Sequence, residues 1–122
     1  MNIEQARDYC LSKLGTTEGM PFGEGVLVFK VMSKMYALLA LDALPATMNL
    51  KCNPDRALEL REEYEGVKGG YHMNKKHWNT ITLDADVSDE VIRELIDHSY
   101  DLVVSKLRKV DKEALKQMGE EE

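Results

Sequence analysis

The chain has 122 residues and a net charge of −6, with 22 acidic residues against 16 lysines and arginines. Its length suits one domain, and its 43% hydrophobic and 31% charged content is typical of a globular protein. The longest apolar run, Tyr36–Leu41, is far shorter than the ~20 residues of a transmembrane helix, which excludes a membrane-spanning protein. Met1–Glu4 lacks the basic start of a signal peptide.

The two cysteines, Cys10 and Cys52, have no CxxC or metal-ligand spacing, so we expect no disulfide framework and a cytoplasmic location.

The first half of the chain predicts one helix followed by strands. Asn2 caps the helix, with Gln5 at the position of a capping box, and Gly15 suits a left-handed stop. Residues 16–25 contain Pro21 and three glycines and are predicted to be a loop. Apolar and alternating patterns then predict three strands: Val26–Val31, Met35–Leu41 and Thr47–Cys52.

A tight turn at Ser33–Lys34 would join the first two of these strands. With that turn, the residues expected to share one face of the sheet are Leu27, Phe29, Val31, Tyr36, Leu38 and Ala40. Lys30 then points to the opposite face.

The second half predicts a helix, a hairpin and a long helix. Asn53 caps the first helix, Pro54 is its first residue, Leu58 and Tyr64 line it, and Gly66 ends it. The hairpin joins two predicted strands across a turn, in the order Lys68–Met73, Asn74–His77 and Trp78–Leu83. Ser88 caps the last long helix, and Asp111–Met118 adds one or two helical turns.

This order predicts an α+β fold, with a mainly antiparallel sheet and helices packed on one face. Residues 1–107 form a single domain in this interpretation. Residues 108–122 are a charged C-terminal extension that is partly helical or mobile.

Charge is sorted unevenly along the chain. The predicted strand segments hold six lysines and no acid, so the remainder carries a net charge of −12. Such a molecule would have a basic sheet and acidic helices. A basic face acts locally, because salt screens charges beyond about 8 Å at physiological ionic strength, and it can bind a polyanion despite the negative total. The alternative is that these lysines only solvate and protect the sheet.

The segment Gly69–Thr80 concentrates the unusual residues, including the only Trp and two of the three His. Lys75 and Lys76 in its turn resemble a wing whose lysines meet phosphates, with Asn74 and Trp78 beside them. Alternatively, Trp78 packs on the sheet.

His72 and His77 have no carboxylate or Cys nearby, so no metal site is expected. Gly69–Gly70 lacks the ending of a phosphate loop and more readily permits a bulge or a close approach of backbones. We find no constellation typical of catalysis and expect neither an enzyme nor a cofactor.

The chain resembles the MmcQ/YjbR family over residues 1–107. The segments that carry the resemblance are Pro21–Gly23, Val28–Val31, Asn49–Cys52, Gly70–Asn79 and Glu94–Tyr100. The resemblance implies a CyaY-like (frataxin-like) fold and a non-enzymatic DNA-binding module with two hairpin wings.

Transferred to this sequence, the implied nucleic-acid-binding residues are Lys30, Lys34, Lys51, Asn74, Lys75, Lys76, His77 and Trp78. His72 and Asn79 are either ligand-binding or structural. We expect weak, salt-dependent binding of DNA by a monomer. The alternative partner of the same Tyr71–Asn79 surface is a protein or a small anion.

Overall fold

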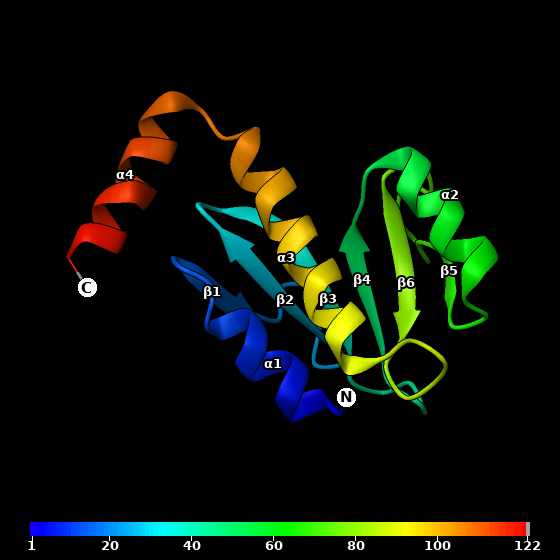
Figure 1. Ribbon diagram of the computed structural model, residues 1–122. Helices are drawn as coiled ribbons and strands as arrows, with labels where there is room; N and C mark the ends of the chain where they lie inside the picture. The colour runs from blue at the N-terminus through cyan, green and yellow to red at the C-terminus, as the bar shows by residue number, and fades with distance from the viewer. Residues whose placement is uncertain (122) are drawn as a thin grey trace.

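The computed structural model describes residues 1–121 and contains one six-stranded antiparallel sheet with helices beside it (Figure 1). The strand order in the sheet is β1-β2-β3-β4-β6-β5. The strands are β1 (Thr16–Gly19), β2 (Val26–Val31), β3 (Lys34–Ala40), β4 (Thr47–Lys51), β5 (Val67–Gly69) and β6 (Trp78–Thr82). The helices are α1 (Ile3–Leu11), α2 (Pro54–Glu63), α3 (Asp89–Ser105) and α4 (Lys109–Glu120). The predicted α+β class is confirmed.

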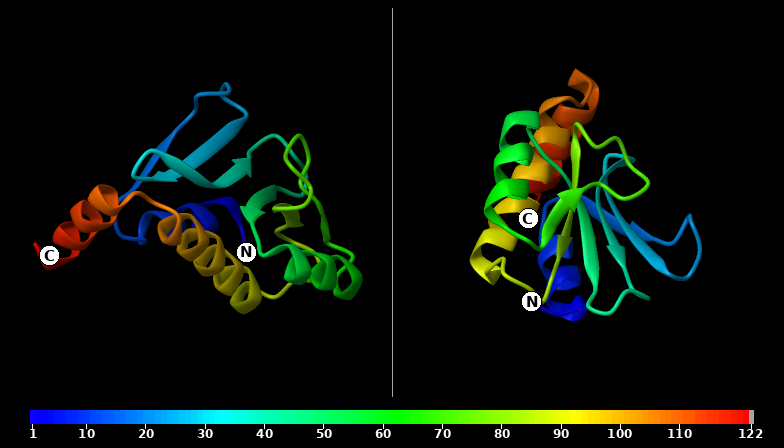
Figure 2. Two further views of the ribbon diagram at one scale, coloured as in Figure 1. Left: turned by 90° about the horizontal axis from the view of Figure 1, so that it is seen from above. Right: turned by 90° about the vertical axis from the view of Figure 1, so that its right-hand side faces the viewer.

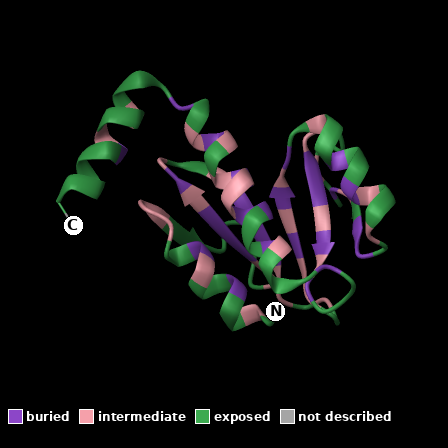
Figure 3. Ribbon diagram, in the orientation of Figure 1, coloured by how far each residue is buried: buried purple, intermediate pink, exposed green. Residues whose placement is uncertain are grey.

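The helices α1, α2 and α3 lie on one side of the sheet and leave its other side without a helical layer (Figure 2). The main core lies between α3 and the central strands, where Ile92, Leu95 and Ile96 pack among Phe29, Leu39 and other buried residues. Figure 3 shows this burial along the strands and along α3. We call the uncovered side of the sheet its open face.

Local signals fix the starts of the helices. Asn2 and Gln5 form the predicted capping box at α1. Asn53 caps α2 ahead of Pro54, and Ser88 caps α3. Within residues 1–121, no helix has the length and apolar character needed to cross a membrane.

The loop predicted over residues 16–25 is partly wrong, because its first residues form the edge strand β1. Thr16 to Gly19 pair with Val31 to Val28 of β2. This strand contains Glu18, which bonds Arg7 of α1 at 2.6 and 2.8 Å. The strands are therefore not free of acids, although Glu18 is on the helix-covered side.

The register predicted for β2 and β3 is also wrong. The turn residues are Met32 and Ser33, both with positive φ as a two-residue hairpin turn requires, and Val31 pairs with Lys34. A bulge between Phe29 and Lys30 then shifts the pairing by one residue. Tyr36 and Ala37 consequently join the main core, and Leu38 moves to the open face.

The remaining differences concern element ends. The β5 strand is only Val67–Gly69, and residues 70–77 form a loop rather than a tight turn. In α2 the buried residues are Ala57 and Leu60, whereas Leu58 is exposed and Glu63 is the last helical residue.

The C-terminal extension contains the twelve-residue helix α4, whose buried Leu115 lies against the Gly15 turn. Glu122 lies outside the described residues.

Candidate functional site

The open face has an apolar centre. Val28, Leu38 and Trp78 form a buried cluster there, separate from the main core, and Val26, Met35 and Met73 pack around it. These side chains come from strands β2, β3 and β6 and from the 70–77 loop. The open face is thus more than a solvated surface, because it buries apolar side chains without a helix to cover them.

Hydrogen bonds fasten the 70–77 loop over this face. Asn49 on β4 donates from Nδ2 to the Tyr71 carbonyl at 3.2 Å, and its Oδ1 accepts from the Thr80 hydroxyl at 2.5 Å. Thr80 Oγ1 in turn accepts from the Tyr71 backbone N–H at 2.9 Å. This closed set of three bonds places Tyr71 and its neighbour His72 above β4 and β6.

The 70–77 loop also depends on a close approach between the backbones of Gly70 and Trp78. A Cβ on Gly70 would lie 2.7 Å from Trp78 Cβ and 3.0 Å from the Trp78 carbonyl oxygen. Only glycine fits there, in agreement with the prediction for Gly69–Gly70. His72 has a positive φ of 59°, which is uncommon for a residue with a side chain, and its ring lies 4.0 Å from that of Tyr71.

The loop and the sheet enclose a cleft of about 410 Å³. Its floor consists of open-face residues of β2 and β3, chiefly Val26, Met35, Leu38 and Ala40. Phe22, from the β1–β2 loop, forms one wall, and the segment Tyr71–Met73 forms the other. Both loops rise from the open face in the two views of Figure 2. The volume is within the range of small-ligand sites, roughly 300–1,000 Å³.

Three of the predicted lysines point to the open face or lie in its loop, and their ammonium groups have no partner within residues 1–121. Lys30 on β2 and Lys51 on β4 alternate with core residues and so face away from the helices. Lys76 is exposed in the 70–77 loop. The register places Lys30 and Lys51 at the same end of their strands as this loop. They therefore lie just beyond the Met35 end of the cleft, outside its lining.

Two other predicted lysines are placed differently. Lys34 is next to Met35 on β3, and because neighbours on a strand point to opposite faces, Lys34 is directed away from the open face. The ammonium of Lys75 donates to the Gly70 carbonyl at 3.3 Å, and its chain lies beside Gly69. Lys75 therefore packs along its own loop.

Trp78 packs on the sheet, which decides between the two interpretations of this residue. Its side chain is 9% exposed and cannot stack with a base. Asn79 is 1% exposed and structural: its Oδ1 accepts from Arg61 Nε at 2.7 Å, and its Nδ2 donates to the Ala57 carbonyl at 3.3 Å.

Asn74 and His77 also stabilise the 70–77 loop by accepting backbone hydrogen bonds. Asn74 Oδ1 accepts from the Lys76 N–H at 2.9 Å, and the His77 carbonyl accepts from the Cys52 N–H at 2.8 Å. His72 is exposed and lines the cleft.

Of the two aromatic walls, the sequence predicts only Tyr71, as part of the Tyr71–Asn79 surface, and gives Phe22 no functional role. Phe22 is 63% exposed and Tyr71 is 69% exposed, although both are large apolar or aromatic residues. Phe22 lies in a loop rich in Gly and Pro. An aromatic residue in such an exposed loop is the sequence signal that can point to a binding role for Phe22. The cleft itself depends on the bulge in β2–β3, which has no clear sequence signature.

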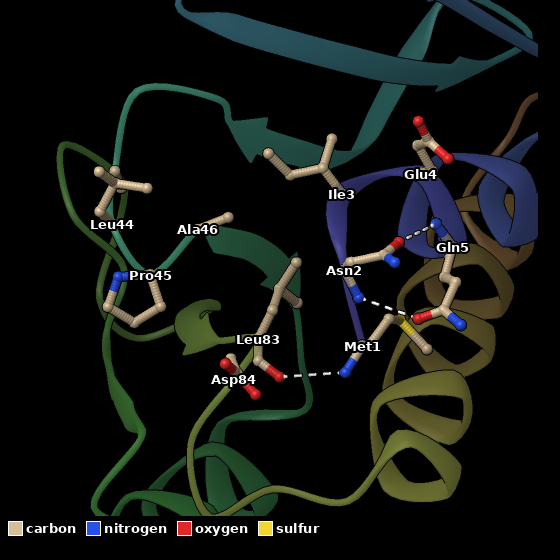
Figure 4. A pocket seen from close by; sticks show the side chains of 11 residues that line it. Met1, Asn2, Ile3, Glu4, Gln5, Leu44, Pro45, Ala46, Leu83 and Asp84 are labelled. Atoms are coloured by element: carbon tan, nitrogen blue, oxygen red, sulfur yellow. Dashed lines mark hydrogen bonds between the residues drawn. The ribbon is translucent and has the colours of Figure 1, made fainter.

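A second, wider hollow of about 670 Å³ lies at the start of α1, between residues 43–46 and Leu83–Asp84 (Figure 4). Several of its polar groups already have hydrogen-bond partners. Asn2 and Gln5 complete the capping box, and the Met1 ammonium donates to Asp89 at 2.6 Å and to the Leu83 carbonyl at 3.5 Å. The open-face cleft is therefore the better candidate.

The thiols belong to the main core rather than to the lining of this cleft, and they are poorly suited to nucleophilic chemistry. Burial raises the pKa of Cys10 to about 12 and also raises that of Cys52, which disfavours the reactive thiolate. Within residues 1–121, the His, Cys, Asp and Glu side chains form no group of three or more that could hold a metal ion.

Comparisons with known proteins agree on one family. The YjbR family model matches residues 11–102. YbdF of Escherichia coli O157:H7 is 38% identical over 97 residues, which cover 79% of each chain. YjbR of Escherichia coli K12 is 29% identical over 118 residues, covering 97% of this chain and all of that protein.

Among solved structures, the crystal structure of Deinococcus radiodurans DR2400 superposes with a TM-score of 0.88 at 39% identity, covering 94% of this chain and 88% of that one. The crystal structure of a Pseudomonas syringae protein gives a TM-score of 0.74 at 30% identity, covering 84% of this chain and 98% of that one. The matched sequence and the shared fold lead to one conclusion: the chain belongs to the YjbR family.

Proposed function

We propose that this protein is a non-enzymatic DNA-binding module that uses the open face of its sheet. One observation carries the proposal: lysines, and no acids, occupy the charged strand positions of that face. They are Lys30, Lys51 and Lys68, the last of which pairs with Thr80 across β5–β6. Glu18 of β1 is on the helix-covered side and bonds Arg7. Two free, buried cysteines are consistent with a cytoplasmic setting.

The principal phosphate contacts are assigned to Lys30, Lys51 and Lys76. In the part of the chain that the structure describes, their ammonium groups make no ion pair or hydrogen bond, and the first two lie beyond the end of the cleft from which the 70–77 loop rises. Lys75 contributes less because it is bonded to Gly70. Lys34, on β3, is directed away from the open face and is assigned no contact.

The small number of contacts implies weak and salt-dependent binding. Each neutralised phosphate adds about −0.9 to the slope of log K against log salt for duplex DNA and about −0.7 for a single strand. Three contacts therefore predict a loss in affinity of roughly 40-fold for a duplex, or roughly 20-fold for a single strand, between about 50 and about 200 mM salt. A binding curve measured at one salt concentration would not test this.

The test is a DNA titration at these two salt concentrations with matched charge reversals. The double variant Lys51→Glu, Lys76→Glu is expected to abolish binding that the parent shows at low salt. The control, Lys112→Glu with Lys116→Glu, makes the same change in net charge on exposed residues of α4. Equal losses in both variants, or unchanged binding in the first, would show that the open face is not the DNA site.

The apolar cleft favours a second candidate, an interaction domain for a protein or a small anion. The floor of Val26, Leu38 and Ala40 offers apolar contact that salt does not weaken. Binding of a partner that persists at high salt and ignores the Lys51/Lys76 reversal would identify this function instead.

A further inference from the structure

We infer that the nucleic acid bound by the open face is single-stranded, with unpaired bases entering the cleft between Phe22 and Tyr71 and phosphates outside it on Lys30 and Lys51. This inference rests on the proposed DNA-binding function and specifies the form of its ligand. It follows from four features of the cleft: its aromatic walls, its apolar floor, its hydrogen-bonding groups and the charges at its ends.

The walls are two aromatic side chains that remain largely in solvent. Phe22 is 63% exposed and Tyr71 is 69% exposed, on loops that lie on opposite sides of the cleft. Exposed aromatic side chains beside a basic surface are the usual platform for unpaired bases, because every base offers a π-face for stacking. The bases of an intact duplex are stacked on each other and cannot use such a platform.

The floor suits a base better than a phosphate. Met35, Leu38 and Ala40 would leave a buried phosphate without hydrogen bonds, and burying an unpaired charge is costly. A planar base in the same place covers apolar side chains while its phosphate stays in water. Lys30 and Lys51 are positioned for that phosphate, since they are on the same face as the floor and at its end.

The polar groups of the cleft predict little discrimination between bases. Asn49 uses its Oδ1 for Thr80 and one N–H for the Tyr71 carbonyl. One N–H of its amide is left for a base, together with the Thr47 hydroxyl and the exposed His72 ring. With so few groups, stacking dominates over hydrogen-bonded readout, and binding should tolerate many sequences.

The charges at the two ends limit the length of strand that the cleft can hold. Lys30 and Lys51 lie just beyond the Met35 end, whereas Glu24 and Asp42 flank the other end, next to the last β2–β3 pair of Val26 with Ala40. A phosphate backbone is attracted at the first end and repelled at the second. The site therefore spans a few nucleotides, near the lower limit of about 4 known for small single-strand binding domains.

The experiment compares a labelled oligothymidylate of about 12 nucleotides with the same strand annealed to oligoadenylate, using fluorescence anisotropy and the full chain. The single strand is expected to bind more tightly. Tyr71→Ala and Phe22→Ala are each expected to weaken single-strand binding by roughly 5- to 150-fold, corresponding to the loss of one stacked base. Tyr71→Phe keeps the ring and is expected to bind as the parent does.

A control separates stacking from the loss of any exposed apolar group. Leu44 is 96% exposed in the β3–β4 loop and does not line the open-face cleft, so Leu44→Ala should leave binding unchanged. If the duplex binds as tightly as the single strand and the aromatic variants bind normally, the inference is wrong and the lysine-based function remains. If neither nucleic acid binds the parent chain at low salt, both the inference and the proposed function are wrong.

Discussion

Arg61 of α2 connects the helix to the base of the 70–77 loop, and its removal should show how much stability this connection provides. Its Nε donates to Asn79 Oδ1 at 2.7 Å, and its Nη2 donates to the Trp78 carbonyl at 3.3 Å and to the Lys75 carbonyl. Arg61→Met keeps much of the apolar stem but leaves the 1% exposed Asn79 with an unpaired oxygen. An unsatisfied buried acceptor costs about 1–3 kcal/mol, and we expect a loss of about 2–3 kcal/mol for the three bonds together.

The partner variant distinguishes an unpaired acceptor from simple loss of contact. Asn79→Leu removes the buried polar group and leaves Arg61, which is only half-buried and can reach water, so a loss of about 1 kcal/mol is expected. In the double variant the buried acceptor that Arg61 pairs with, Asn79 Oδ1, is absent. The two changes together should therefore cost less than their sum by about 1–2 kcal/mol.

Urea unfolding, with midpoints and slopes for all four proteins of the cycle, measures this difference. Arg56→Met, an exposed change on the same helix, is the control and should stay within about 0.5 kcal/mol of the parent. Strict additivity of Arg61→Met and Asn79→Leu would refute the reasoning, because it would show that the two side chains do not depend on each other.

Two further predictions concern stability. His98 Nε2 accepts the Asn53 N–H at 3.1 Å, and burial, followed by the charge of Arg56, lowers its pKa below the ordinary 6.5 despite the opposing effect of Asp101. Because the folded state then binds fewer protons than the unfolded state, the free energy of unfolding should be constant above about pH 6.5 and fall as the pH drops below that value. His98→Gln should reduce this fall in a plot of unfolding free energy against pH. Gly70→Ala should cost about 1–3 kcal/mol because its Cβ would overlap Trp78, whereas Gly19→Ala, with no atom within 4 Å of the new Cβ, should have little effect; equal unfolding midpoints would contradict this.

Local signals in the sequence predict the helix starts and most of the core. Asn2, Asn53 and Ser88 each stand directly before an apolar or helix-favouring run, and a capping bond needs only residues close in sequence. The stripe that includes Ile92 and Ile96 is also local, because helical periodicity alone brings its members to one face.

Features that depend on pairing between distant strands could not be predicted in the same way. The bulge at Phe29/Lys30 places both Tyr36 and Ala37 in the core, and period-two alternation cannot anticipate one extra residue. The strand β1 is a short edge strand with a polar sequence, and only its pairing with β2 reveals it.

The candidate site was predicted in part for the same reason. Charge and strand alternation together predict Lys30 and Lys51 on one face of the sheet, and both lie on the open face. The burial of Trp78 depends on Val28 and Leu38, which meet it only once β2, β3 and β6 lie in one sheet. The walls of Phe22 and Tyr71 likewise come from loops almost fifty residues apart in sequence.

The bulge also makes β3 sensitive to insertions and deletions that the 20–25 loop tolerates. Deleting one residue between Ser33 and Leu38 would reverse the alternation along β3 and exchange the floor of the cleft for core residues. Lengthening the 20–25 loop would move Phe22 without disturbing any strand pair. New binding preferences can therefore arise by insertions in the two walls, while the length of β3 must stay constant.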